Sequence, residues 1–129
     1  MANGSDCTRL GQLSPEYLTL RESYQEVIDC VKESTESICN ALFSKGIITT
    51  ENRDYARHPT HLGSHKAGKL VDAVLDKIEH DKKVFQDFIK ILKHEGLCTQ
   101  SIVELLENKY KQKLTEEKEY NNNIYIKFI

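Results

Sequence analysis

Residues 66–78 read KAGKLVDAVLDKI, and this stretch decides the fold class. Its apolar side chains recur every three or four residues; they are Ala67, Leu70, Val71, Val74, Leu75 and Ile78. Such spacing places them on one face of an α-helix and leaves the lysines and aspartates on the other. A short amphipathic helix is not stable alone, so this one must bury its apolar face against other elements of the chain.

The same periodicity predicts three helices before this stretch. Ser14-Pro15-Glu16 starts the first, because it offers a capping hydroxyl and a proline at the first helical position. A second helix is capped by Ser34 or Thr35 and closed by Gly46, and a short third helix covers 51–57.

Two more helices follow the stretch. Pro59 ends the third helix, and the helix of 66–78 begins at Thr60 or Ser64. A fifth helix carries an apolar face over 85–92, and a sixth carries one over 102–110. Because each of the six helices has one apolar face, we predict an all-α bundle around a common core.

The composition is that of one ordinary globular domain. The chain has 129 residues, of which 39% are hydrophobic and 29% are charged, and its net charge is −2. This apolar content is enough to build a core, and the near-neutral charge disfavours a globally basic nucleic-acid binder. No apolar run approaches the roughly 20 residues of a membrane-spanning helix. We therefore expect neither nucleic acid nor a membrane as the partner.

The four cysteines are Cys7, Cys30, Cys39 and Cys98, and none of them forms a CxxC pair. Such close pairs are what zinc sites and thioredoxin-type chemistry require. The N-terminus also lacks the basic and apolar regions of a secretory signal. We therefore expect reduced thiols and a cytoplasmic location.

We divide the chain into a flexible leader (1–13), a helical domain (14–112) and a C-terminal tail (113–129). The tail begins with charged residues, which either extend the sixth helix or are disordered, and it ends in the strand-prone run IYIKFI at 124–129. Three interpretations of this end stay open. It packs back on the bundle, it pairs with an edge of another chain, or it is an artefact of truncation.

Four stretches, in this order and with suitable spacing, resemble a caspase-recruitment domain (CARD) of the death-fold superfamily. They are GIITTE at 46–51, KAGKLVDAVL at 66–75, FQDF at 85–88 and LKHEG at 92–96. The resemblance covers about residues 15–111. It implies a six-helix antiparallel Greek-key bundle with a bent first helix. It also implies a non-enzymatic adaptor that binds another CARD or itself, in some members as filaments, to assemble apoptotic or innate-immune signalling complexes.

The resemblance also implies two complementary charged patches. In many CARDs a basic patch on the first and fourth helices meets an acidic patch on the second and third helices of a neighbour. Carried onto this sequence, the basic patch is Arg21, Lys66 and Lys69. The acidic patch is Glu36, Glu51 and Asp54.

This chain departs from that pattern on two helices. The first helix presents an acidic stripe where basic charge is usual, made of Glu22, Glu26, Asp29 and Glu33. The fifth helix and its approach are basic, with Lys82, Lys83, Lys90 and Lys93. The polarity of the interface is therefore redistributed relative to the family pattern.

No pattern in the sequence indicates catalysis. The nucleotide-binding, metalloprotease and nucleophile-elbow motifs are all missing. His58, His61 and His65 have a spacing that could hold a metal, but Pro59 and Gly63 interrupt any regular helix there. We therefore expect no cofactor, no metal and no small-molecule substrate.

Three alternatives remain beside a CARD. One is another death-fold module, such as a death or death-effector domain, and another is a plain helical binding module that does not polymerise. Binding of nucleic acid by the basic fifth helix is the third. It is disfavoured because Asp81, Asp87 and Glu95 interleave with the lysines.

Overall fold

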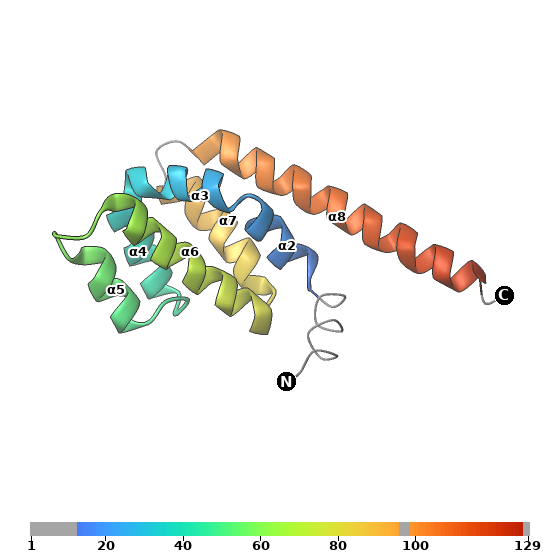
Figure 1. The fold of residues 1–129 in the computed structure, drawn as a ribbon, viewed down its shortest axis with the longest axis horizontal. Helices are drawn as coiled ribbons and strands as arrows, with labels where there is room; N and C mark the ends of the chain where they lie inside the picture. Colours follow the sequence, from blue (N-terminus) through green and yellow to red (C-terminus); the bar gives the residue numbers. More distant parts are fainter. Residues whose placement is uncertain (1–12, 96–98, 128–129) are drawn as a thin grey trace.

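The computed structural model describes residues 13–95 and 99–127, with side chains described for 13–95 and 100–119. Nearly all of the predicted leader, together with Cys7, Cys98, Gly96 and residues 128–129, lies outside these ranges. Every regular element within them is helical (Figure 1). The elements are α2 (Pro15–Glu22), α3 (Tyr24–Val31), the 3-10 turn η1 (Lys32–Ser34), α4 (Thr35–Ser44), α5 (Thr50–Arg57), α6 (Gly63–His80), α7 (Lys83–Glu95) and α8 (Thr99–Lys127). The all-α prediction is confirmed.

The predicted first helix is divided into α2 and α3 at Ser23. It starts as expected, because the Ser14 side chain accepts a hydrogen bond from the Tyr17 backbone N–H at 3.1 Å and Pro15 stands at the first helical position. At Ser23 the backbone turns to φ −104° and ψ 19°, which interrupts the regular helix. The first helix of this chain is therefore bent, as the family resemblance implies.

Local signals also fix the junction between α4 and α5. Gly46 has φ +72°, a left-handed conformation that glycine adopts without strain, and it closes α4. The Thr49 hydroxyl then accepts from the Asn52 N–H, and the Asn52 side chain accepts from the Thr49 N–H, both at 3.1 Å. This reciprocal capping box starts α5.

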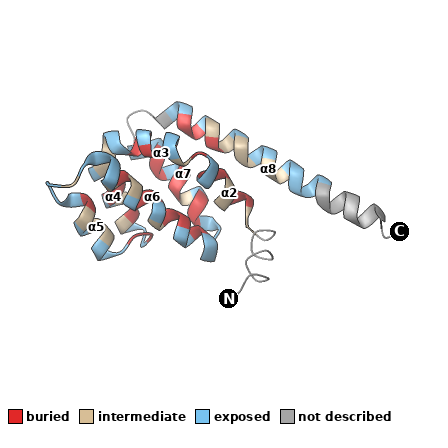
Figure 2. Cartoon of the chain, in the orientation of Figure 1, coloured by how far each residue is buried: buried red, intermediate tan, exposed pale blue. Residues whose placement is uncertain are grey.

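The helices share one core, and α6 is at its centre (Figure 2). All six apolar positions of the stretch 66–78 are buried, as predicted. Helix α6 packs against α2, α3, α4, α5 and α7. Phe85 and Phe88 of α7 are the largest fully buried side chains and fill the space between these helices.

The start of α6 differs from the prediction. Neither Thr60 nor Ser64 caps it: the helix begins at Gly63, and Leu62 stands at the N-cap position without a side-chain capping bond. The Thr60 hydroxyl lies 2.7 Å from Nδ1 of His58 instead. This local bond within the turn uses the hydroxyl that would have capped the helix.

Helix α8 extends the sixth helix into the tail, which is one of the two alternatives that the sequence left open for the charged start of the tail. It runs for 29 residues from Thr99 to Lys127, and its last turns project beyond the bundle (Figure 1). A helix that has started is extended at little cost, and strand propensity counts only where a neighbouring strand pairs with the segment. The sixth helix therefore continues through the proposed domain boundary at 112/113 and through the part of 124–129 that the structure describes.

Candidate functional site

The predicted basic patch depends on how the first helix lies against α6. Gly63 lies beside Lys32, and the Tyr24 hydroxyl donates to Oδ1 of Asp72 at 2.7 Å. The start of α6 is therefore next to the end of the first helix, and the two run antiparallel. Burial, together with the hydrogen bond to Asp72, raises the pKa of Tyr24 to about 12.

This arrangement divides the predicted basic patch. Lys66 and Lys69 lie in the first two turns of α6, and the ammonium of Lys69 is 5.2 Å from the centre of the Tyr55 ring. Arg21 precedes Tyr24 on the antiparallel helix and is therefore level with a part of α6 beyond Asp72. The two lysines lie near the start of α6, and Arg21 is level with a later part of that helix, beyond Asp72.

The predicted acidic patch contains two arginines. Glu51 and Asp54 are exposed on neighbouring turns of α5. Glu36 is in the first turn of α4. Besides burial, its charge raises the pKa of the Cys39 thiol, while the charges of Arg57 and Arg53 lower it, so all three charged side chains lie near Cys39. Arg53 also lies 3.8 Å from Asp54, so the arginines of α5 lie among the residues of the predicted acidic patch.

The same neighbourhood argues against a reactive thiol. Burial raises the pKa of the Cys39 thiol, and the nearby Arg57 and Arg53 oppose this only in part. Cys39 is a free thiol, as predicted, and it is fully buried. The Arg53 guanidinium lies 4.2 Å from the centre of the Phe43 ring and covers this side of the core.

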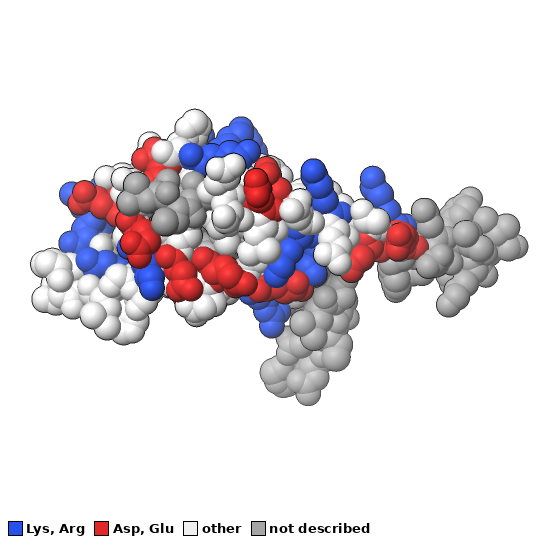
Figure 3. Space-filling model, turned by 90° about the horizontal axis from the view of Figure 1, so that it is seen from above, with Lys and Arg blue, Asp and Glu red and all other residues white. Residues whose placement is uncertain are grey.

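The acidic stripe of the first helix is a real surface feature (Figure 3). Its four carboxylates are exposed on α2, α3 and η1. The Glu22 carboxylate forms an ion pair with the ammonium of Lys113 on α8 at 2.8 Å. The Asp29 carboxylate lies 3.7 Å from the ammonium of Lys32. Glu26 and Glu33 form no ion pair with any residue that the structure describes.

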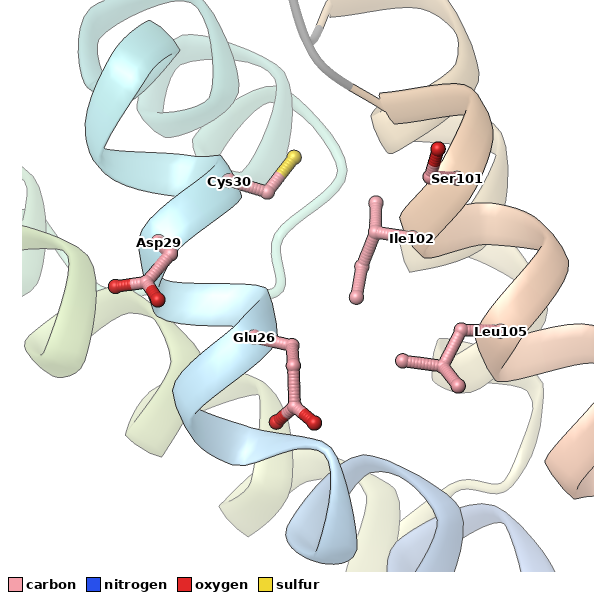
Figure 4. Close-up of a pocket in the computed structure, with 6 residues that line it drawn as sticks. All are labelled: Glu26, Asp29, Cys30, Ser101, Ile102 and Leu105. Atoms are coloured by element: carbon pink, nitrogen blue, oxygen red, sulfur yellow. The ribbon is translucent and has the colours of Figure 1, made fainter.

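A groove of about 360 Å³ runs beside this stripe, between α3 and α8 (Figure 4). Ile102 and Leu105 of α8 form its apolar side, and Glu26 and Asp29 line it from α3, although the Asp29 carboxylate points away from α8. We define the α3–α8 groove by these four residues together with Cys30 and Ser101. The sequence assigned Ile102 and Leu105 to the core, and only the packing of α8 on α3 leaves part of them in an open groove.

The turn between α5 and α6 presents a second feature that the sequence analysis missed. We define the Leu62 tip as residues 58–62, which carry no lysine, arginine or carboxylate. Leu62 is 64% exposed and is the only large hydrophobic side chain among the described residues that is exposed in this way. The His61 ring stacks on Tyr55 with 3.8 Å between ring centres, which holds the turn in one shape.

The structure offers no arrangement suited to a metal or to a membrane span within its described ranges. No group of three or more His, Cys, Asp or Glu side chains is placed to hold a metal ion there. His61 instead bonds the Tyr55 carbonyl, with 2.8 Å between Nδ1 and the oxygen. None of the described helices combines the length and the apolar composition that crossing a bilayer requires.

Comparisons with protein-family models, with curated proteins and with solved structures found no match for this chain. The resemblance to a CARD therefore stays a prediction drawn from the sequence. The charged surfaces described above are the features that any proposed function has to use.

Proposed function

We propose that this chain is a CARD-like interaction module with an antiparallel Greek-key arrangement of six helices. It is a cytoplasmic, non-enzymatic adaptor that binds another CARD or a second copy of itself, and so helps to assemble an apoptotic or innate-immune signalling complex. The helix neighbours support this fold. The bent first helix packs on α6 and α8, α4 packs on α5 and α7, and α5 packs on α6.

One observation carries the proposed binding role: opposite charges lie unpaired on different helices of the same small bundle. Lys66 and Lys69 on α6 make no ion pair with any described residue, and neither does Glu51 on α5. The neighbouring Asp54 lies 3.8 Å from Arg53. A single exposed ion pair contributes only about 0–1 kcal/mol, so binding needs several such pairs acting together. Two different surfaces on each copy allow a head-to-tail contact that repeats.

Charge reversal at one residue of each surface tests this proposal. Lys66→Glu and Asp54→Lys are each expected to abolish association, measured by size-exclusion chromatography with light scattering at low and high salt. Both side chains reach solvent, so helical circular dichroism and melting temperature should stay as in the parent chain. Binding is measured for the chain alone and with a panel of other CARDs.

Lys111→Glu is the matched control, because Lys111 is exposed on α8 away from both surfaces. It should associate like the parent chain. Association that both reversals leave unchanged would remove these surfaces from the proposal. A parent chain that binds neither itself nor any CARD would overturn the proposed function as a whole.

A further inference from the structure

We infer that the Leu62 tip of one copy docks into the α3–α8 groove of a second copy. This inference rests on the self-binding included in the proposed function, and it pairs the lysines of α6 with α3 of the second copy instead of with Glu51 and Asp54 of α5. The tip supplies an exposed apolar side chain, and the groove supplies an apolar surface of matching character.

The apolar match is specific within this molecule. Leu62 is the exposed large hydrophobic residue of the described chain, at 64% exposure. The groove is bordered on the α8 side by Ile102 and Leu105, and Leu105 is only half-buried. Burying a leucine against such a surface removes apolar area from water on both partners, and this is the dominant favourable term in most protein association.

The charges beside the two surfaces are opposite in sign. Leu62, Lys66 and Lys69 are spaced by four and three residues, so they lie along one face of α6. Glu26 and Asp29 have the equivalent spacing along α3. When Leu62 enters the groove, Lys66 or Lys69 can therefore approach the Glu26 carboxylate, whereas the Asp29 carboxylate points away from α8.

The carboxylates of the rim are not equally available. Asp29 already accepts from Gln25 at 3.1 Å and lies near Lys32, whereas Glu26 forms no ion pair with a described residue. On the face of α8 that carries Leu105, the nearest lysine is Lys109, which lies one helical turn beyond Leu105. Glu26 is therefore the carboxylate best placed to meet a lysine of the second copy.

Both surfaces are held in shape before they meet. The Tyr55–His61 stack and the bond between His58 and Thr60 fix the tip. On the groove side, the ion pair of Glu22 with Lys113 ties α2 to α8 at 2.8 Å. Preorganised surfaces lose little conformational entropy on binding, so a small contact of this kind can contribute to assembly.

Leu62→Asp tests the tip. Aspartate is a favourable N-cap residue, so this variant should keep or slightly raise the melting temperature while it places a carboxylate where the apolar contact would form. We expect self-association of the full chain to need a concentration about tenfold higher or more, as is typical when an interface anchor is lost. The measurement is light scattering across a concentration series.

Glu26→Lys tests the groove, and Glu79→Lys is its matched control. Both glutamates are exposed on helices, and Glu79 lies near the far end of α6, away from tip and groove. Glu26→Lys should weaken self-association, and Glu79→Lys should not.

Mixing the two defective variants gives the sharpest result. The Leu62→Asp chain keeps a working groove and the Glu26→Lys chain keeps a working tip, so an equimolar mixture retains one intact contact. We expect a one-to-one complex that grows no further, formed at a concentration where neither variant associates alone. A mixture that behaves as the sum of its two components overturns the tip–groove contact.

The remaining outcomes separate this inference from the proposed function. If Leu62→Asp and Glu26→Lys associate like the parent chain, the tip–groove contact is wrong and the patches of the proposed function are unaffected. If the parent chain is monomeric at every concentration, the contact between copies is wrong, and the binding of other CARDs decides the proposed function.

Discussion

Helices α6 and α8 are the two longest described helices, and they are held in opposite ways. The 18 residues of α6 are packed by helices on several sides, and its apolar face is completely buried. The 29 residues of α8 pack on α2, α3 and α7 at one end only, and the side chains at 115–119 are all exposed. Helix length alone therefore says little about how much a helix contributes to stability.

The same substitution in both helices tests this difference and should give the largest effect. Leu70→Ala in α6 removes a side chain that is 1% exposed, and should lower the free energy of unfolding by about 2–5 kcal/mol. Leu114→Ala in α8 removes a half-buried side chain and should cost less than about 1 kcal/mol, because little apolar area becomes exposed. Urea denaturation followed by circular dichroism measures both, and equal losses would contradict the comparison.

Two tyrosines tie the first helix to α8 and to α6, and they should give an intermediate effect. Tyr110 of α8 donates to Oε2 of the buried Glu16 at 2.6 Å, and Oε1 of that carboxylate has no hydrogen-bond partner among the described residues. Tyr110→Phe leaves a buried carboxylate without its hydrogen bond and should cost about 1–3 kcal/mol. Tyr24→Phe frees the exposed Asp72 to bind water and should cost about 0.5–1.5 kcal/mol.

The alkaline side of the stability curve checks the same two tyrosines. Burial, and then the hydrogen bond to Glu16, raises the pKa of Tyr110 to about 12, and the pKa of Tyr24 is also about 12, from an ordinary 10.0. Their contribution is fully present below pH 10 and is lost as pH rises towards 12, because the unfolded tyrosine releases its proton first. Each Phe variant should show a shallower loss of melting temperature over this range, and an unchanged slope would contradict the assignment.

Deletion of residues 120–129 should give the smallest effect on stability. The end of α8 projects beyond the bundle, so its removal should change the free energy of unfolding by less than about 0.5 kcal/mol (Figure 1). The helical signal in circular dichroism should fall in proportion to the residues removed. A large loss of stability or of self-association would instead show that this end packs on the bundle or on another copy, two interpretations that the sequence left open.

The candidate site was only partly predictable. The sequence identified each charged residue, and it also recognised the acidic stripe on the first helix. It grouped Arg21 with Lys66 and Lys69, although Arg21 is level with a part of α6 beyond Asp72. It treated Glu36, Glu51 and Asp54 as one acidic patch, although Arg53 and Arg57 lie among them. Charge types are visible in a sequence, but which charges share a surface depends on how antiparallel helices are aligned.

The sequence by itself determined that this chain is helical and which side chains are buried in its central helix, because apolar spacing of three and four residues is a local property. It also determined the start at Pro15 and the end of α4 at Gly46, since capping and left-handed glycine act within one turn. Only the tertiary structure decided that α6 begins at Gly63 with Leu62 at its N-cap, that α8 continues past residue 112, and that α3 and α8 border a groove. These features depend on contacts between residues far apart in the chain, whose alignment no local spacing specifies.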